Sequence, residues 1–432
     1  MISAFFHKIW AYTLMLVCQL SSQGCAYGAV AVEAPIDAPI DTPSQLNIKL
    51  PAGFKISIFS QLFKKVNGEN IAQPRMMAFD SQGRLYVALA STNQIAMLPD
   101  ANKDGLAETP VIIANQLNAP NSIAFVDDNT MLIGNQDGVV TIRQVNGKWS
   151  APTPFISNLP SGNHTYKTVK IGPDGFLYVN VGSSCNVCNE PDPLRATILR
   201  YTLEGKPTGS QIQDTLGASS PIWVKGLRNS QGFAWRPSGA MFATNDGADD
   251  RSSTKNGKVN DNIPPEHLNR IEAGKHYGWP YCWGNPSDLI TPANLHTMVK
   301  DPNFLADSVD FCRTSTPPAI TFTSHSTPIG ITFLDKTNFP AEYKNDAIVA
   351  LHGSWNRKAL SGYKLVRVKF NGDNPIEVLD FATGWLNIDS TGSNEAQSQA
   401  WGRPVDVIAG PDGALYVSDD RAAVIYRISY QQ

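Results

Sequence analysis

The sequence has few charged residues and no excess of basic ones. Lys and Arg number 35 against 38 Asp and Glu, which gives a formal net charge of −3, and charged residues make up only 17% of the chain. Proteins that bind nucleic acids need a basic stripe or patch to neutralise phosphates. The composition therefore argues against a nucleic-acid partner.

Several patterns of common protein classes are also missing. Beyond the N-terminus, no segment approaches the run of about 18 apolar residues that indicates a membrane-spanning helix. No Gly-x-Gly-x-x-Gly loop, Walker loop, Gly-x-Ser-x-Gly elbow or His-Glu-x-x-His motif stands in a suitable context. The chain does have 33 glycines and 30 prolines, which indicate many turns and favour an all-β fold.

The N-terminus has the pattern of an export signal. His7 and Lys8 precede an apolar run over residues 11–20, and small residues follow it. This run is too short to cross a membrane and is typical of a signal peptide. We therefore expect residues 1–31 to be a signal peptide and the protein to be periplasmic or secreted.

The rest of the chain is expected to form a linker and one domain. The Pro- and Ala-rich stretch 32–44 is typical of a linker, and residues 45–432 remain for a single domain. Gly24-Cys25 offers an alternative, a lipoprotein cleavage site with a lipid anchor at Cys25. Against that alternative, Ser22 stands where an aliphatic residue is usual.

Four cysteines lie outside the signal region, and an even number in an oxidising compartment suggests disulfides. Cys185 and Cys188 have the spacing of a CxxC motif. A zinc site would need a second close pair or nearby histidines, and a redox motif would need a helix N-terminus. Two structural disulfides, Cys185–Cys188 and Cys282–Cys312, are the favoured interpretation, although the sequence alone leaves the pairing open.

A short pattern recurs along the chain: an apolar pair, a polar turn and an alternating aromatic-aliphatic strand. Asp-Gly and similar dipeptides supply the turn residues with positive φ that β-hairpins need. The turns near Gly83, Asn129 and Gly175 are 46 residues apart, a spacing that suits a four-stranded propeller blade. The copies stand at residues 76–88, 122–134, 169–182, 232–244, 328–353 and 406–420.

These copies predict an all-β fold, a six-bladed β-propeller with four-stranded antiparallel blades and long loop insertions. Six blades of about 45 residues need about 270, so the domain has residues to spare. The insertions are expected at 185–220, 245–320 and 353–362. A pair of β-sandwiches would explain the strands but not their regular spacing. A propeller closes on itself and carries its sites at the mouth of the central channel.

Histidines and arginines beside the repeat strands are candidate site residues. His164, His325 and His352 stand at loop edges, although a lone histidine is more often structural than catalytic. Arg228, Arg357 and Arg403 also lie beside repeat strands. Each could be an ordinary salt-bridged arginine, but together they suggest a multiply anionic ligand.

Two acidic segments are candidate calcium loops. Residues 246–250 gather Asp246, Asp249 and Asp250 around Gly247-Ala248, and such hard oxygens suit Ca²⁺ through side chains or backbone carbonyls. The segment 100–108 resembles the start of an EF-hand loop but lacks its final glutamate. We interpret the second segment as a polar turn.

Four longer motifs resemble the soluble PQQ-dependent glucose/sorbosone dehydrogenase family, over about residues 50–432. They are GLRNSQGFAW (226–235), HLNRIEAGKHYGWP (267–280), FPAEYKNDAIVALHGSWNR (339–357) and GRPVDVIAGPDGALYVSDD (402–420). GSSCNVC and HGSWNR are similar to the sorbosone-dehydrogenase-like branch. The resemblance implies a six-bladed propeller that holds pyrroloquinoline quinone (PQQ) over the channel, with Ca²⁺ clamping the cofactor.

The resemblance also implies catalytic roles at matching positions. His164 would be the general base that takes the proton of the substrate hydroxyl, because the usual pKa of histidine lies near working pH. Arg228 and Asn229 would contact the quinone, with Arg228 near the carbonyl where negative charge develops. Gly247 and Ala248 would offer backbone carbonyls to Ca²⁺.

Further implied contacts involve the cofactor carboxylates and a second calcium. Arg403 would pair with a PQQ carboxylate, and Glu266 falls near an acidic pair that binds structural calcium in relatives. Arg357 stands near the place of a lysine that the family uses beside the carboxylates, and His325 is predicted as a further cofactor contact.

The sequence departs from the family pattern at several positions. Lys167 and Thr168 stand where Gly-Arg is common, Ser230 replaces a proline, and His267 follows Glu266 where a second acid is usual. The expected activity is oxidation of an aldose or related sugar or aldehyde, with a cytochrome or quinone as external electron acceptor. The alternatives are a calcium-dependent propeller lactonase and a non-catalytic sugar- or protein-binding propeller.

Overall fold

The computed structural model describes residues 47–62, 72–210, 216, 220–286, 297–304, 309–386 and 400–431. The predicted signal peptide, the predicted linker and Cys25 lie outside these residues, so those three predictions remain untested. Within the described ranges, no helix is long and apolar enough to cross a membrane.

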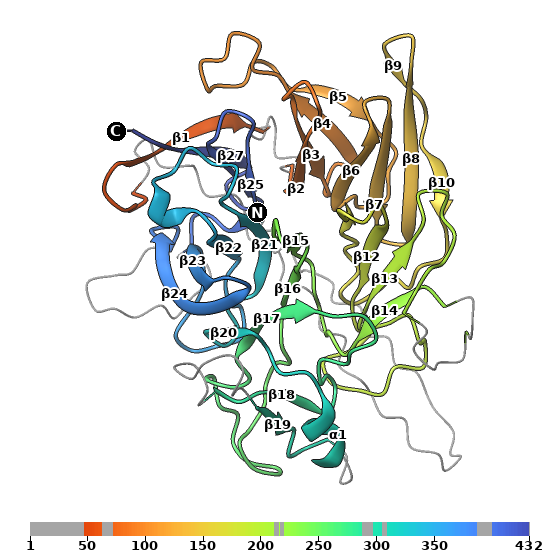
Figure 1. Ribbon diagram of the computed structural model, residues 1–432, viewed down its shortest axis with the longest axis vertical. Helices are drawn as coiled ribbons and strands as arrows, with labels where there is room; N and C mark the ends of the chain where they lie inside the picture. Colours follow the sequence, from red (N-terminus) through yellow and green to blue (C-terminus); the bar gives the residue numbers. More distant parts are fainter. Residues whose placement is uncertain are drawn as a thin grey trace, which may run out of the picture. The chain divides into compact units, whose positions relative to one another are not determined.

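Six antiparallel sheets form the six blades of a β-propeller (Figure 1). Blade 1 holds β2 (Pro74–Phe79), β3 (Leu85–Leu89), β4 (Gln94–Leu98) and β5 (Val111–Ala114), from the innermost strand outward. Blade 2 holds β6 (Ser122–Asp127), β7 (Thr130–Asn135), β8 (Gly138–Val145) and β10 (Thr153–Ile156), and short β9 (Lys148–Trp149) pairs with β8. Blade 3 holds β11 (Val169–Ile171), β12 (Leu177–Val181), β13 (Thr197–Tyr201) and β14 (Ile222–Lys225).

The remaining three blades repeat this order. Blade 4 holds β15 (Phe233–Trp235), β16 (Met241–Asn245), β17 (Glu266–Ile271) and β20 (Ile320–Phe322). Blade 5 holds β21 (Pro328–Phe333), β22 (Ala347–Leu351), β23 (Lys364–Asn371) and β24 (Asn374–Ala382). Blade 6 holds β25 (Pro404–Ala409), β26 (Leu415–Asp419), β27 (Val424–Tyr430) and β1 (Phe54–Gln61). The predicted fold class is confirmed.

The turn that produces the sequence repeat is held by a short-range hydrogen bond. In three blades the hydroxyl of the second-strand tyrosine donates to the turn aspartate: Tyr86 to Asp80 at 3.2 Å, Tyr178 to Asp174 at 2.8 Å, and Tyr416 to Asp412 at 3.2 Å. The turn glycines Gly83, Gly175 and Gly413 all have φ of 78°, a backbone conformation that glycine adopts at little cost.

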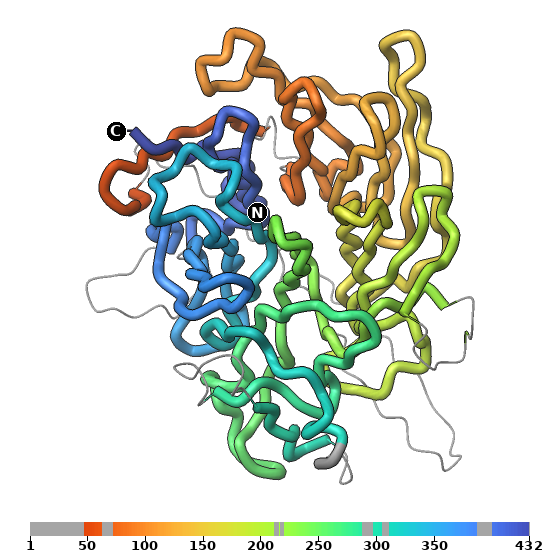
Figure 2. Tube along the Cα trace, in the orientation of Figure 1, coloured from red at the N-terminus to blue at the C-terminus, as the bar shows by residue number. Residues whose placement is uncertain are grey.

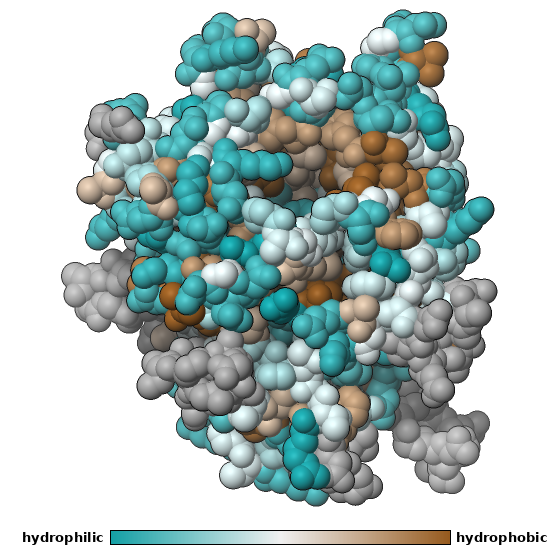
Figure 3. All heavy atoms as spheres, viewed as in Figure 1, coloured by the Kyte–Doolittle hydropathy of each residue, from teal (hydrophilic) through white to brown (hydrophobic). Residues whose placement is uncertain are grey.

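The core lies between the blades. Six clusters of buried apolar residues each join two neighbouring blades, and together they pass once around the ring. The second strands β3, β12, β16, β22 and β26 are buried along their whole length. On the face in Figure 3, hydrophobic residues gather around the hollow among the blades, and hydrophilic residues cover most of the outer loops.

The first strand of the described chain closes the ring. β1 pairs antiparallel with β27, from Phe54 opposite Tyr430 to Gln61 opposite Val424, and Figure 2 shows this N-terminal trace running beside the C-terminal one. The ring of Phe54 makes edge contacts with Phe339, Tyr343, Phe381 and Tyr430, at centroid distances of 4.7 to 5.1 Å.

Two of the predicted insertions contain blade strands, which corrects their extent. β13 lies inside the range 185–220, and β17 lies inside 245–320. Turn-rich flanks interrupt the apolar pattern of these short strands, so the sequence does not separate them from loop. True insertions remain, and the one between β17 and β20 contains β18 (Cys282–Gly284), β19 (Met298–Lys300) and helix α1 (Val309–Thr314). Blade 5 also carries a short 3₁₀ turn, η4 (Ala341–Tyr343), between β21 and β22.

Both predicted disulfides are present. Cys282 in β18 is bonded to Cys312 in α1 and ties the insertion of blade 4 together. Cys185 is bonded to Cys188 in the loop after β12. The pairing that the sequence left open is thereby settled.

Candidate active site

The topology brings the predicted site residues to one end of the blades. In an antiparallel blade, the first strand begins at the end where the second strand finishes and the third starts. We call this end the channel mouth. The residues just before β11, β15, β21 and β25 are His164, Arg228, Asn229, His325 and Arg403. Gly247 and Ala248 follow β16, Arg357 follows β22, and Glu266 begins β17.

Arg228 is a buried cation with several acceptors around it. Only 1% of the residue is exposed. Nη1 lies 3.3 Å from Asp246 Oδ2, and Nη2 lies 2.8 Å from Asp249 Oδ2. The backbone oxygen of Asn186 accepts from Nε at 3.2 Å, and its side-chain oxygen accepts from Nη2 at 3.1 Å. These bonds fix the plane of the guanidinium.

The carboxyl groups around Arg228 differ in pKa because their surroundings differ. Burial raises the pKa of Asp246 to about 6, against the opposing effect of Arg228. Burial acts in the same direction on Asp249, but Arg228 and His325 outweigh it and lower that pKa to about 2. Burial, followed by the charge of Asp246, raises the pKa of Glu266 well above its usual value. Buried carboxylates that lie this close together repel one another, and a bound proton or a bound cation would reduce that repulsion.

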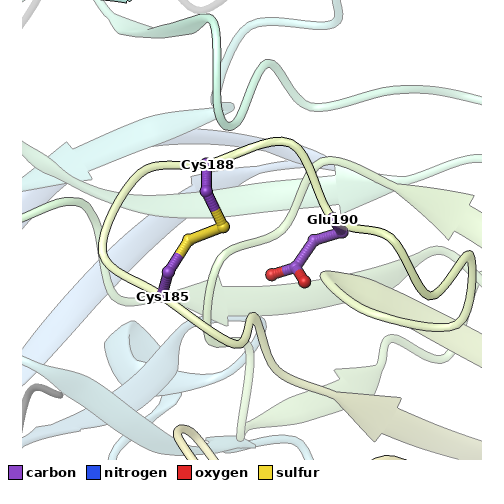
Figure 4. A group of neighbouring side chains, drawn as sticks. All are labelled: Cys185, Cys188 and Glu190. Atoms are coloured by element: carbon purple, nitrogen blue, oxygen red, sulfur yellow. A yellow bond between two sulfur atoms is a disulfide. The ribbon is translucent and has the colours of Figure 1, made fainter. Parts of the chain in front are cut away.

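A calcium ion would fit here only with help from backbone oxygens. In the described part of the chain, Cys185, Cys188 and Glu190 form the only group of three His, Cys, Asp or Glu side chains with ligand atoms within 4.8 Å of one another. The two sulfurs of that group are bonded to each other (Figure 4), so they leave no thiolate for a metal. Asp246, Asp249 and Glu266 thus do not form a closed cage, and carbonyls such as those of Gly247 and Ala248 would have to complete it.

His164 is held in one tautomer by its neighbours. Its Nδ1 lies 3.1 Å from the Ser183 carbonyl oxygen and 2.8 Å from Ser183 Oγ. Ser183 Oγ donates its own hydrogen to the Cys185 carbonyl at 2.7 Å, so both groups facing Nδ1 act as acceptors. The hydrogen must therefore sit on Nδ1, which leaves the lone pair of Nε2 free to take a proton.

The imidazole of His164 is also neutral. Burial, followed by the charge of Arg228, lowers its pKa to about 3. The backbone at His164 has a positive φ of 46°, an uncommon conformation outside glycine. A Cβ on Gly182 would stand 2.4 Å from His164 Cβ and 3.4 Å from Asn229 Oδ1, so His164 and Asn229 flank the same glycine. The absence of a side chain at Gly182 makes this approach possible.

The loop after β22 also reaches the Arg228 group. Asn356 Nδ2 donates to Asp249 Oδ1 at 2.6 Å, and His325 Nδ1 lies 3.5 Å from the same oxygen. Arg357 instead donates to the Ser324 carbonyl at 3.0 Å. The described contacts therefore link His325 to Arg228 through Asp249, whereas Arg357 bonds to the residue just before His325 and to Asn262 Oδ1 at 3.3 Å.

Arg403 belongs to a second charged group at the channel mouth. It donates to His352 Nδ1 at 2.8 Å, and His352 Nε2 lies 3.0 Å from Asp420. Burial, followed by the charge of Arg403, lowers the pKa of His352 to about 4. Arg75 joins this group to blade 4, because it donates to Asp420 at 3.0 Å and to Gln231 at 2.8 Å.

Several predicted cofactor residues carry buried polar atoms without a hydrogen-bond partner in the described structure. These atoms are Asn229 Oδ1, Arg357 Nε and Arg403 Nε. A buried polar group without a partner costs stability, so a polar, multiply anionic ligand would relieve the two guanidinium nitrogens. The donor set fits a polycarboxylated cofactor, and its role remains a prediction.

A family model described as TrAA12-like matches residues 59–431. The chain belongs to the TrAA12-like family. Within a broader grouping, this TrAA12-like protein is a member of the soluble PQQ-dependent glucose/sorbosone dehydrogenase-like β-propeller superfamily.

Curated relatives of the TrAA12-like protein are distant. An uncharacterized protein of Borreliella burgdorferi is 28% identical over 89% of this chain and 91% of its own length. Aldose sugar dehydrogenase YliI of Escherichia coli is 26% identical over 62% of this chain and 60% of its own length. Pyrroloquinoline quinone-dependent pyranose dehydrogenase of Coprinopsis cinerea is 24% identical over 83% of this chain, and the match spans 52% of that protein.

Solved structures share the fold of the TrAA12-like protein. The holo form of the pyranose dehydrogenase PQQ domain from Coprinopsis cinerea matches 91% of this chain and 99% of its own, with a TM-score of 0.73 at 19% identity. The calcium structure of the Trichoderma reesei family AA12 enzyme matches 90% of this chain and 98% of its own, with a TM-score of 0.72 at 19% identity.

The departures from the family pattern have structural roles in the TrAA12-like protein. Lys167 is fully buried, and its Nζ donates to the Thr165 and Gln136 carbonyls at 2.7 and 3.1 Å. Thr168 Oγ1 donates to the Gln231 carbonyl at 2.6 Å. Burial lowers the pKa of Lys167 to about 7. Both residues hold the loop that follows His164.

Sequence reasoning missed several residues of the charged groups, above all Asn186 and Arg75. Asn186 lies within the CxxC spacing that predicted a structural disulfide, and nothing in that spacing indicates its contacts. Arg75 stands one residue before the first repeat copy, which begins at Met76. Its place at the start of an inner strand was the one signal that could have found it.

Proposed function

We propose that this protein is a PQQ- and Ca²⁺-dependent dehydrogenase that oxidises an aldose or related sugar or aldehyde. The observation that carries the proposal is a neutral imidazole at His164 with a free Nε2, beside the fixed guanidinium of Arg228. A base next to a cation can take a hydroxyl proton while the cation stabilises developing negative charge. The names of two curated relatives, an aldose sugar dehydrogenase and a PQQ-dependent pyranose dehydrogenase, support the same chemistry.

The proposed division of work assigns each predicted residue a task. When bound, PQQ would supply the quinone that accepts a hydride from the substrate carbon. Arg228 and Asn229 would hold the quinone, and Gly247, Ala248 and Glu266 would provide oxygens for Ca²⁺. Arg403, Arg357 and His325 would contact the cofactor carboxylates or their surroundings.

His164 would act on the substrate itself. Its Nε2 would accept the proton of the hydroxyl group, while Nδ1–H stays bonded to Ser183. Burial, followed by the charge of Arg228, lowers the pKa of the ring to about 3, well below the value near working pH expected from the sequence, so the ring would hold that proton only briefly. Arg228 would stay charged throughout and would not move, because four acceptor contacts hold it.

The calcium-dependent lactonase alternative finds less support. Such an enzyme would bring several acidic side chains onto one metal, and the carboxylates at the channel mouth do not converge within 4.8 Å in the described residues. The sorbosone-dehydrogenase-like branch is our finer proposal, because the Cys185–Cys188 loop and the segment after β22 both reach the Arg228 group.

The proposal can be tested by reconstitution. Purified apo-protein is titrated with PQQ in the presence of Ca²⁺, and dye reduction is followed with a panel of aldoses and aldehydes. We expect a change in quinone absorbance on binding, and turnover with at least one sugar. No binding would refute the dehydrogenase proposal, and binding without turnover would support a non-catalytic sugar- or protein-binding propeller.

Location and electron transfer complete the proposal. We propose that residues 1–31 direct export, and that the protein works in the periplasm or outside the cell with a cytochrome or quinone as acceptor. Fractionation of expressing cells tests the first point, and a Cys25→Ala variant that leaves a membrane fraction would indicate a lipid anchor. Accumulation in the cytoplasm would contradict export.

A further inference from the structure

The four-residue ring closed by Cys185 and Cys188 lies directly at the channel mouth. It follows β12 and precedes β13, and the residues on its two sides are bonded to each other. Ser184, just before the ring, donates to the Glu190 carboxylate through its amide at 2.6 Å and its hydroxyl at 2.7 Å. Figure 4 shows the disulfide and Glu190 on the same loop, which these bonds hold together.

Asn186, inside this ring, uses every polar atom of its side chain. Oδ1 accepts from Arg228 Nη2 at 3.1 Å and from the Asp249 amide at 2.7 Å, and Nδ2 donates to the Asp249 carbonyl at 2.8 Å. Its backbone oxygen accepts from Arg228 Nε at 3.2 Å and from Trp279 Nε1 at 2.9 Å. One residue thus joins blade 3 to three separate segments of blade 4.

These contacts decide how Arg228 is oriented. Asp246 and Asp249 accept from Nη1 and Nη2, and the backbone oxygen of Asn186 adds the bond to Nε, so that all three guanidinium nitrogens are held. The two bonds to Asn186 hold Nε and Nη2 at the same time. The paired bonds to Asp249 give its backbone a partner for both N–H and C=O, as a strand neighbour would.

The same ring reaches His164. The Cys185 carbonyl accepts the hydrogen of Ser183 Oγ at 2.7 Å, and this bond obliges the Ser183 oxygen to act as acceptor toward His164 Nδ1. A displaced Cys185 carbonyl would free the serine hydrogen, and the Ser183 carbonyl alone would then hold the Nδ1–H tautomer of His164.

We propose that Asn186 is a positioning residue, held by the Cys185–Cys188 ring, that orients Arg228 and the Asp249 backbone at the channel mouth. The disulfide has a different task from the Cys282–Cys312 bond, which ties an insertion together. The effect of Asn186 on turnover rests on the proposed function, whereas its effect on the Asp249 segment does not.

The first test measures the positioning without any cofactor. Amide hydrogen exchange of the apo-protein is followed by mass spectrometry over the segment 245–252. Asn186→Ala removes the acceptor of the Asp249 amide, so we expect exchange of that amide to become at least about tenfold faster. Asn189→Ala is the matched control, because Asn189 is exposed in the same loop and bonds only Tyr281 Oη among the described residues.

The second test opens the ring in the wild-type protein. A dithiol such as dithiothreitol gives two electrons and two protons to the Cys185–Cys188 bond, which yields two thiols and the cyclic disulfide of the reagent. We expect the same amide to exchange faster after reduction. A Cys282→Ser/Cys312→Ser variant, treated in the same way, assigns the effect to the ring and remains informative if Asn186→Ala does not fold.

Cofactor binding is the third measurement. We expect Asn186→Ala to weaken PQQ binding by at least about tenfold in calorimetric titration with Ca²⁺ present, and Asn189→Ala to leave it unchanged. Unchanged exchange at Asp249 in both Asn186→Ala and the reduced protein would overturn the proposal. Faster exchange together with no PQQ binding by the wild type would refute the proposed function and leave the positioning role intact.

Discussion

Two features of its surroundings keep the His164 ring neutral and in one tautomer. Its Nδ1 faces two acceptors on Ser183, and burial beside Arg228 lowers its pKa to about 3. A base with a free Nε2 can act only if a substrate hydroxyl reaches that atom.

Replacement of the base separates binding from turnover. His164→Ala removes the proton acceptor but none of the groups proposed to hold the cofactor, so we expect PQQ affinity to stay within about threefold of the wild type. Turnover should fall by roughly 10²- to 10⁴-fold, the usual contribution of a positioned base. Steady-state dye reduction and calorimetric titration measure the two effects, and near-normal turnover would point to a different base.

The pH profile provides a second check on the same residue. The pKa of His164 is about 3 against a usual value of 6.5, so the neutral form persists as the pH falls. We expect no loss of kcat from this group between about pH 5 and 8. An acid limb near pH 6.5 that disappears in a slow but active His164→Gln variant would contradict the pKa shift.

The lowered pKa has a stability counterpart with a definite sign. The unfolded imidazole takes up a proton near pH 6.5, whereas the folded one does so only near 3. The contribution of neutral His164 to the free energy of unfolding is therefore complete above pH 6.5 and is lost as the pH falls toward 3.

At the scale of elements, the two disulfides stabilise segments of very different length. Cys282 and Cys312 are separated by 30 residues, and Cys185 and Cys188 by 3. The entropy that a crosslink removes from the unfolded chain grows with the enclosed loop.

Loss of the longer crosslink should accordingly cost more stability. We expect Cys282→Ser/Cys312→Ser to lower the free energy of unfolding by about 3 to 4 kcal/mol, and Cys185→Ser/Cys188→Ser to lower it by about 2 kcal/mol. Urea unfolding followed by fluorescence measures both. If the short ring proved the more important for stability, its loop would carry packing that the loop-length argument omits.

The sequence predicted some elements well and others poorly, for a physical reason. The first two strands of a blade share a tight turn, and pairs such as Asp80 with Tyr86 or Asp174 with Tyr178 lie only a few residues apart. The residues that specify this turn are close together in the sequence, and the same pattern recurs in several blades. β13 and β17 pair with partners across turn-rich loops, so their ranges were predicted as insertions.

The residues of the candidate site were likewise predictable where the signal was local and not where it was long-range. Placing His164, Arg228 and Arg403 beside inner strands was enough to predict that they lie at the same end of the blades. The contacts of Asn186 instead join residues 42 to 93 positions apart. Such contacts depend on how blades 3 and 4 are placed, and no short motif encodes that placement.

At the scale of the whole molecule, the fold depends on the pairing of β1 with β27 in blade 6. Phe54 is buried in this blade interface among four other aromatic rings. Removal of a buried phenylalanine ring costs about 3 to 5 kcal/mol.

We therefore expect Phe54→Ala to destabilise the entire propeller by about 3 to 5 kcal/mol in urea unfolding. Ile376→Ala in β24 is a suitable control, because Ile376 is 59% exposed and its truncation should change stability by less than about 0.5 kcal/mol. A Phe54→Ala protein as stable as the control would show that the ring stays closed without this packing.

The pairing of β1 with β27 also sets the order of events during synthesis. β1 leaves the ribosome before the strands of blades 1 to 5 and must wait for residues 424–430, its partner strand. Blades 1 to 5 can each gather their own strands as they emerge, but blade 6 stays incomplete until β27 has been made. Until then β1 has no partner strand, and the ring of blades remains open.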